Sequence, residues 1–159
     1  MPLDALLEAL APERRRGRKV VFTNGCYDLL HVGHVQLLRR AAAEGDILVL
    51  GVNSDDSVRR LKGPERPFVP FDERAELLAG LEMVDFVVEF AQDTPAEMIH
   101  AIRPDVLVKG GDWAVDRIVG RDTVEAAGGR VLSIPLVPGR STSSLVEKIR
   151  AEGEAGRKP

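Results

Sequence analysis

The chain has 159 residues, a length typical of one domain built around a single hydrophobic core. Its formal net charge of −3, with 30% charged residues, excludes a generally basic surface for binding nucleic acid. The one cysteine, Cys26, cannot form an internal disulfide, which is typical of a reducing compartment. The amino terminus lacks a basic segment followed by an apolar one, and no apolar run could span a bilayer. We therefore predict a cytoplasmic protein with no signal peptide and no membrane partner.

Strand-like and helix-like patterns alternate along the chain, after an N-terminal leader, residues 1–18, that we expect to be helical. Short apolar and β-branched runs predict strands at 19–22, 47–52, 86–90, 106–108 and 131–134. Helical patterns predict helices at 33–44, 72–81, 95–103, 122–127 and 143–150. A loop rich in glycine and proline, 63–70, leads into the second of these helices. Residues 151–159 are expected to form a frayed C-terminal tail.

The third helix has the clearest start signal. Thr94 is a good N-cap, Pro95 suits the first helical position, and Glu97 stands where a capping box requires an acidic residue.

Five strands that alternate with helices predict an α/β fold, a doubly wound five-stranded parallel sheet of the Rossmann-like kind, in a single domain over 19–150. In such sheets, ligands bind beyond the carboxyl ends of the strands, near the switch in strand order. Polar residues follow four of the predicted strands at this edge, in the segments 23–25, 53–55, 109–112 and 139–142. These segments are therefore candidates for a binding site.

Two histidines, His31 and His34, lie three residues apart with Gly33 between them, where the first strand gives way to a helix. Helix positions i and i+3 share one face, and the free N–H groups at a helix amino end attract phosphate. We predict that the pair binds the triphosphate of a nucleotide. The alternatives are two unrelated surface or core histidines, or a zinc site, for which Cys26 would be a poor third ligand. No metal ligand is therefore assigned.

Two better-known nucleotide motifs are absent. The sequence has no GxxxxGKS/T P-loop, and no GxGxxG follows the first strand. Neither hydrolysis of the P-loop kind nor dinucleotide binding is expected.

The HxGH box within Thr23–His34, together with Arg140–Ser143, resembles the cytidylyltransferase-like nucleotidyltransferases. More narrowly, the segments 60–64, 66–67, 93–95 and 108–112 resemble the D-glycero-β-D-manno-heptose 1-phosphate adenylyltransferases. The resemblance covers about 19–150. Because a fused sugar-kinase half does not fit into 159 residues, the stand-alone form is expected.

The resemblance implies that a sugar 1-phosphate oxygen attacks the α-phosphorus of ATP and releases pyrophosphate, with positioning and charge neutralisation as the main sources of catalysis. His31 and His34 would hold the α- and β-phosphates, and neither is assigned as a general base. Lys62, in the flexible loop, would be a catalytic cation that also binds the phosphate substrate; a solvated lysine is the alternative. Arg74 would bind substrate from the following helix, with a structural salt bridge as the alternative.

The resemblance also implies a set of nucleotide-binding residues. They are Thr23, Asn24, Gly25, Gly33, Lys109, Gly111, Asp112, Gly139, Arg140, Ser141, Thr142 and Ser143. The last five combine hydroxyls, a guanidinium and helix-end N–H groups, a combination that suits the β- and γ-phosphates. Two glycines could equally make the segment 109–113 a simple strand-end turn, and Asp28 could serve to cap a turn. No acidic metal cage is visible, so Mg²⁺ is expected to arrive with ATP.

The first functional hypothesis is an adenylyltransferase that makes ADP-heptose from a heptose 1-phosphate and MgATP. The second is a cytidylyltransferase that acts on glycerol 3-phosphate or a similar small phosphate. The third is an inactive nucleotide-binding module that regulates a partner. Because dimers are common among enzymes that this chain resembles, a homodimer is also considered.

Overall fold

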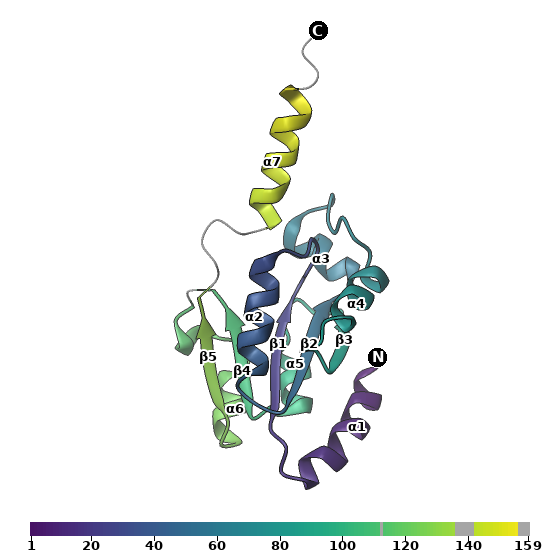
Figure 1. Cartoon of the computed structure of the whole chain (residues 1–159). Coiled ribbons are helices and arrows are strands. Elements are labelled where there is room, and N and C mark those ends of the chain that lie inside the picture. Colours follow the sequence, from purple (N-terminus) through teal and green to yellow (C-terminus); the bar gives the residue numbers. More distant parts are fainter. Residues whose placement is uncertain (112, 136–141, 156–159) are drawn as a thin grey trace.

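A computed structural model describes residues 1–111, 113–135 and 142–155. Its centre is a five-stranded, wholly parallel sheet with strand order β3-β2-β1-β4-β5 (Figure 1). The strands are β1 (Val20–Gly25), β2 (Ile47–Asn53), β3 (Phe86–Phe90), β4 (Val106–Gly110) and β5 (Arg130–Ile134). The chain winds outward from β1 to β3, returns, and continues on the other side through β4 and β5. The predicted doubly wound sheet is confirmed, and its switch in strand order lies between β1 and β4.

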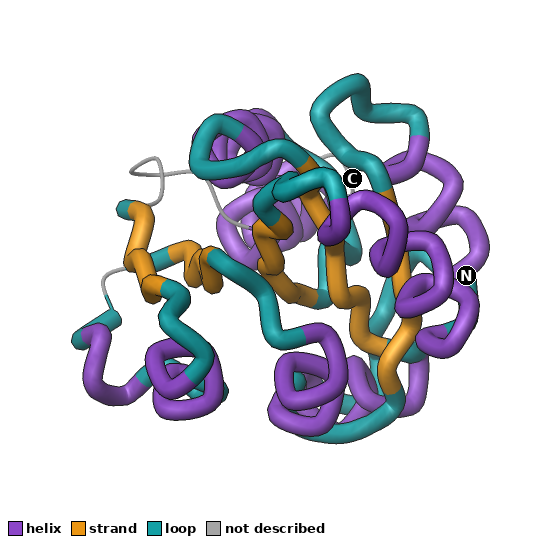
Figure 2. Tube along the Cα trace, turned by 90° about the horizontal axis from the view of Figure 1, so that it is seen from below, coloured by secondary structure: helices purple, strands orange, loops and turns teal. Residues whose placement is uncertain are grey.

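Helices cover both faces of the sheet (Figure 1, Figure 2). One face packs against α1 (Leu3–Arg15), α5 (Ala96–Ile102) and α6 (Arg121–Ala126), and the other against α2 (Val32–Ala42) and α4 (Phe71–Ala79). Successive strand residues serve opposite faces, as the pleat requires: Val20 and Phe22 belong to the first core and Val21 to the second. No helix in the described parts of the chain combines the length and apolar composition that crossing a membrane requires.

Three carboxylates fix the amino edge of the sheet. Each precedes a strand and accepts a hydrogen bond from a backbone N–H of a neighbouring segment. The bonds run from Lys19 N to Asp46 Oδ2 at 2.8 Å, from Leu48 N to Asp85 Oδ2 at 2.8 Å, and from Val20 N to Asp105 Oδ2 at 2.7 Å. These side chains are therefore part of the framework that aligns the strands.

One helix, α3 (Asp55–Lys62), is missing from the sequence prediction. Its signals are all local and polar: the Ser54 hydroxyl caps the Ser57 N–H at 3.2 Å, acidic residues occupy the first turn and basic ones the last. Because this short helix buries little apolar surface, it has no hydrophobic stripe to reveal it. Lys62, which was predicted to lie in the flexible loop, is therefore the last residue of a helix.

Two other helix boundaries differ from the prediction. The N-cap of α5 is Pro95, not Thr94, so Glu97 lies one position too early for a capping box, and its side chain accepts a hydrogen bond from Gln92 at 2.9 Å. The last helix, α7 (Thr142–Ala155), continues past the predicted end at residue 150. It extends away from the sheet, above its carboxyl edge (Figure 1).

Candidate active site

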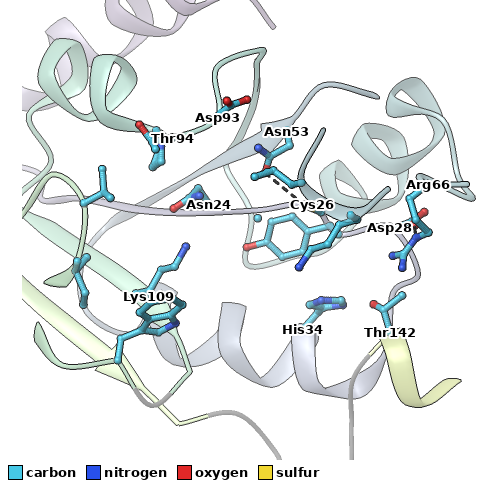
Figure 3. A pocket seen from close by; sticks show the side chains of 18 of the residues that line it. Asn24, Cys26, Asp28, His34, Asn53, Arg66, Asp93, Thr94, Lys109 and Thr142 are labelled. Carbon is cyan, nitrogen blue, oxygen red and sulfur yellow. Dashed lines mark hydrogen bonds and ion pairs between the residues drawn. The ribbon is translucent and has the colours of Figure 1, made fainter. Parts of the chain in front are cut away.

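A cleft of about 600 Å³ opens at the carboxyl edge of the sheet, around the ends of β1, β2 and β4 (Figure 3). This is the switch point at which open α/β sheets bind ligands. Seven of the predicted site residues line it together: Asn24, Gly25, His31, His34, Lys62, Lys109 and Thr142. The topology thus brings together side chains from five separate segments of the sequence.

The two histidines converge as predicted, although His31 is not a helical residue. It is the extended N-cap of α2, and its Nδ1 accepts a hydrogen bond from Gly33 N at 3.1 Å. His34 lies in the first helical turn, and the two imidazoles stack with ring centroids 3.9 Å apart and planes inclined by 20°. The cap therefore fixes one ring, and the stacking aligns the other beside it.

His34 is held in a partly buried and electrically neutral state. The Tyr27 ring contacts it edge-on, with centroids 5.2 Å apart, and its Nδ1 is buried without a hydrogen-bond partner in the described structure. Burial, reinforced by the nearby His31, lowers the pKa of His34 to about 4. At neutral pH it therefore offers an N–H donor rather than a positive charge to a ligand oxygen.

Two lysines supply positive charge to the cleft. Lys62 is exposed at the end of α3, whereas Lys109 is half-buried in β4 with its Nζ 6.0 Å from the centre of the Trp113 ring. Burial lowers the pKa of Lys109, and the charge of Lys62 lowers it further. Neither ammonium pairs with a carboxylate among the residues that the structure describes. Two unpaired cations in one cleft favour an anionic ligand.

The wall formed beside β2 and β3 is polar but carries few charges. Asn53 is buried, donates from Nδ2 to the Ser57 hydroxyl at 2.9 Å, and accepts the Cys26 thiol at a sulfur–oxygen distance of 3.7 Å. Burial raises the pKa of Cys26, which keeps the thiol protonated. Asn24 and Thr94 add an amide and a hydroxyl to this wall (Figure 3).

Arg74 is not placed in the cleft. Its side chain is 0% exposed, and its three nitrogens donate to Val69 O at 2.9 Å, Cys26 O at 2.5 Å and Asp55 Oδ1 at 2.7 Å. Because every nitrogen already has a protein acceptor, the predicted role in substrate binding is not supported. The ion pair with Asp55 agrees instead with the alternative prediction for Arg74, a structural salt bridge.

Three further predicted residues are described by the structure but do not line the cleft. Thr23 is fully buried in β1, and Gly33 is buried in α2. Gly111 has φ +120°, and a Cβ there would lie 2.8 Å from Trp113 Nε1, so a glycine is needed beside the indole. Asp112, Gly139, Arg140 and Ser141 lie outside the described residues, as does the side chain of Ser143. Of the predicted phosphate cradle, Thr142 is therefore the member seen to line the cleft.

Several lining residues had no predicted role: Arg66, Asp93, Thr94, Arg117, Ile118 and Val119. Asp93 and Thr94 follow β3 and share the carboxyl edge with the other candidates, so strand order could have suggested them. The last three belong to or follow a 3₁₀ turn, Val115–Arg117, which has no signal in the sequence. Arg66 belongs to one of the segments that carry the family resemblance, 66–67, but the sequence predicts no function for it.

Comparisons with known proteins identify the family of the chain. The model of the "Cytidylyltransferase-like" family matches residues 22–147. "Bifunctional protein HldE" of Syntrophotalea carbinolica is 56% identical over 153 residues, 96% of this chain and 31% of that protein. The protein of the same name from Citrifermentans bemidjiense is 58% identical over 147 residues, 92% of this chain and 30% of that protein. The chain thus spans about a third of the length of these curated relatives.

Solved structures share the fold at lower sequence identity. A lipopolysaccharide core biosynthesis protein from Thermoplasma volcanium GSS1 superimposes with a TM-score of 0.62 at 23% identity, over 76% of this chain and 97% of that one. Pantothenate synthetase from Thermus thermophilus gives 0.58 at 20% identity, over 86% of this chain and 60% of that one. With a parallel sheet, an HxGH box at its switch point and a family match over most of its length, the chain belongs to the cytidylyltransferase-like nucleotidyltransferases.

Proposed function

We propose that the chain is an adenylyltransferase that transfers AMP from MgATP to D-glycero-D-manno-heptose 1-phosphate, giving ADP-heptose and pyrophosphate. The main observation in support of nucleotidyl transfer is the stacked His31–His34 pair, which lies in one cleft with Lys62, Lys109 and Thr142. The heptose is supported by identities of 56% and 58% to proteins named HldE and by the motif segments 60–64, 66–67, 93–95 and 108–112.

In the proposed reaction, an oxygen of the acceptor phosphate forms a bond to the α-phosphorus of ATP. The bond from that phosphorus to the bridging oxygen of pyrophosphate breaks, and its electron pair leaves with pyrophosphate. His31 and His34 would donate N–H groups to oxygens of the α- and β-phosphates, which gain charge as the leaving group departs. No general base is needed because the acceptor phosphate is already ionised at neutral pH. The protein then acts by positioning and by charge stabilisation.

The cleft offers distinct surroundings to the two substrates. Lys62 and Lys109 would neutralise phosphate charge, while residues 139–143 would hold the β- and γ-phosphates at the start of α7. Asn24 and Gly25 would contact the nucleotide, and the amide and hydroxyl wall of Asn53 and Thr94 suits the hydroxyls of a sugar. Gly111 and Asp112 would lie near the base and ribose. Mg²⁺ would enter as MgATP, held by the triphosphate and water.

The test is a pyrophosphate-release assay over a grid of ATP, CTP, GTP and UTP against heptose 1-phosphate, other sugar 1-phosphates and glycerol 3-phosphate. We expect ATP with heptose 1-phosphate to give the highest kcat/KM. A preference for CTP with glycerol 3-phosphate would favour the cytidylyltransferase alternative. Nucleotide binding without turnover on any acceptor would favour the inactive regulatory module.

We also propose that the enzyme works in the cytoplasm, where ATP is available, and that it forms a homodimer. Apolar side chains that a second copy could cover include Leu77 on α4 and Ile149 on α7, which are 55% and 64% exposed. Light scattering coupled to size-exclusion chromatography tests the dimer, and a monomer mass at micromolar concentration would contradict it.

A further inference from the structure

Arg66 and Arg74 belong to consecutive segments of the chain but have different surroundings. Arg74 donates from all three of its nitrogens to protein acceptors. Arg66 lines the cleft, and its Nε forms an ion pair with Asp28. Its terminal nitrogens, Nη1 and Nη2, make no hydrogen bond with any part of the chain that the structure describes.

Asp28 holds the Arg66 guanidinium in place. The Asp28 side chain is 1% exposed, and its Oδ1 accepts hydrogen bonds from Phe68 N at 2.7 Å and Val69 N at 2.9 Å. A buried carboxylate is costly without a cation, so the ion pair opposes movement of the arginine into solvent. The Phe68 ring lies beneath the guanidinium, with Arg66 Cζ 4.8 Å from its centroid. Carboxylate, backbone and ring together orient the side chain before any ligand binds.

The position of Arg66 suits a phosphoryl ligand. Figure 3 shows Arg66 and Asp28 at the same end of the cleft as His34 and Thr142, and at the opposite end from Lys109. The Arg66 side chain lines the cleft and is 16% exposed, so the guanidinium is largely shielded from bulk water. A guanidinium edge with two donors matches two oxygens of one phosphoryl group better than a lysine does.

We propose that Arg66 binds a phosphoryl group of a substrate in this cleft and that Asp28 is the residue that positions it. The inference rests on the proposed function only in taking the substrates to be phosphates. The phosphoryl group belongs either to the nucleotide or to the acceptor, because both have the chemistry that the guanidinium recognises.

The test compares Arg66→Ala and Arg66→Lys with Arg59→Ala, a matched control on α3 whose arginine pairs with Asp56 and does not line the cleft. Calorimetry measures the affinities for ATP, ADP and AMP, and steady-state kinetics measures the KM for the acceptor phosphate. Loss of a charge-assisted bond at Arg66 should weaken one of these constants by about tenfold or more, and Arg59→Ala should change neither. Arg66→Lys keeps a cation for Asp28, so it remains informative if Arg66→Ala does not fold.

The two sources of the phosphoryl group give different results. Weaker binding of ATP with unchanged binding of AMP would assign Arg66 to the β- or γ-phosphate, and unchanged nucleotide affinity with a raised acceptor KM would assign it to the acceptor. A folded Arg66→Ala protein with all these constants unchanged would overturn the proposal. Failure of the proposed function is distinguishable, because it would show as no pyrophosphate release by the unmodified protein.

Asp28→Asn tests the positioning role. It removes the charge that holds Arg66 and replaces one of the two accepting oxygens with an amide nitrogen of similar size. We expect the constant altered by Arg66→Ala to move in the same direction, by a smaller factor. In the double variant, Asp28→Asn should add little to the effect of Arg66→Ala, since the arginine it positions is gone. Fully additive effects on that constant would contradict the positioning role.

Discussion

The two edges of the sheet use polar residues in opposite ways. At the amino edge, the carboxylates of Asp46, Asp85 and Asp105 each accept a backbone N–H. At the carboxyl edge, the described structure leaves the ammonium groups of Lys62 and Lys109 without a carboxylate. Polar groups that support the fold form hydrogen bonds within it, because a buried polar group without a hydrogen bond costs free energy. Groups that await a ligand are the ones the fold leaves unsatisfied.

The largest expected effect is on catalysis at the carboxyl edge. His34→Ala removes a donor to the reacting phosphates and should lower kcat/KM by roughly 10²- to 10³-fold, in line with the loss of one preorganised donor. The fold should persist, because the imidazole is only half-buried. A pyrophosphate-release assay measures kcat/KM, and circular dichroism with a thermal melt checks that the variant is folded. A rate within twofold of the unmodified protein would exclude the assigned role.

The burial of His34 should also make the fold sensitive to acid. An unfolded histidine has a pKa near 6.5, whereas burial lowers that of folded His34 to about 4. Between these values the unfolded chain binds more protons, so the free energy of unfolding falls as pH falls through this window. From pH 7 to pH 5 the loss should be about 1 to 2 kcal/mol relative to His34→Gln. Urea titrations of both proteins measure it, and parallel pH profiles would contradict it.

A substitution at the amino edge should affect stability instead of turnover. Asp105→Ala leaves the backbone N–H of Val20 without its acceptor, and we expect a loss of about 1 to 2 kcal/mol in the free energy of unfolding. Values of kcat and KM for folded protein should stay unchanged, because the carboxylate lies at the far edge of the sheet from the cleft. Urea denaturation and the pyrophosphate assay separate the two quantities. A large change in kcat with unchanged stability would break the comparison between the edges.

The smallest effect is expected for the exposed cation of the cleft. Lys62→Ala should raise KM for a phosphate substrate by about tenfold, the equivalent of about 1.4 kcal/mol, with little change in the melting temperature. Arg59→Ala, on the same helix and outside the cleft, is the control. Unchanged kinetics in Lys62→Ala would return this residue to the class of solvated lysines.

Much of the fold could be predicted from the sequence, because parallel strands buried on both faces are continuous apolar runs such as 47–52. The helix α3 could not be predicted from periodicity, since capping and charge placement stabilise it with few buried residues. The signal at Thr94 was misleading because the helix begins one residue later, with Pro95 as its N-cap, which moves Glu97 out of the position that a capping box needs.

The histidines of the site could be predicted because their spacing and their glycine are local features. The choice between Arg66 and Arg74 could not, because it depends on acceptors distant in the sequence. Arg74 donates to the carbonyl of Cys26 and to the carboxylate of Asp55. Arg66 donates from Nε to the carboxylate of Asp28, and its two terminal nitrogens have no hydrogen bond among the described residues. Only the folded chain reveals which arginine is already satisfied.

The most direct test is a crystal structure with a non-hydrolysable ATP analogue and Mg²⁺. We predict that the α- and β-phosphates lie within hydrogen-bond distance of His31 and His34, with the rest of the triphosphate directed toward Thr142 at the start of α7. A nucleotide bound outside this cleft, or imidazoles turned away from its phosphates, would contradict the account.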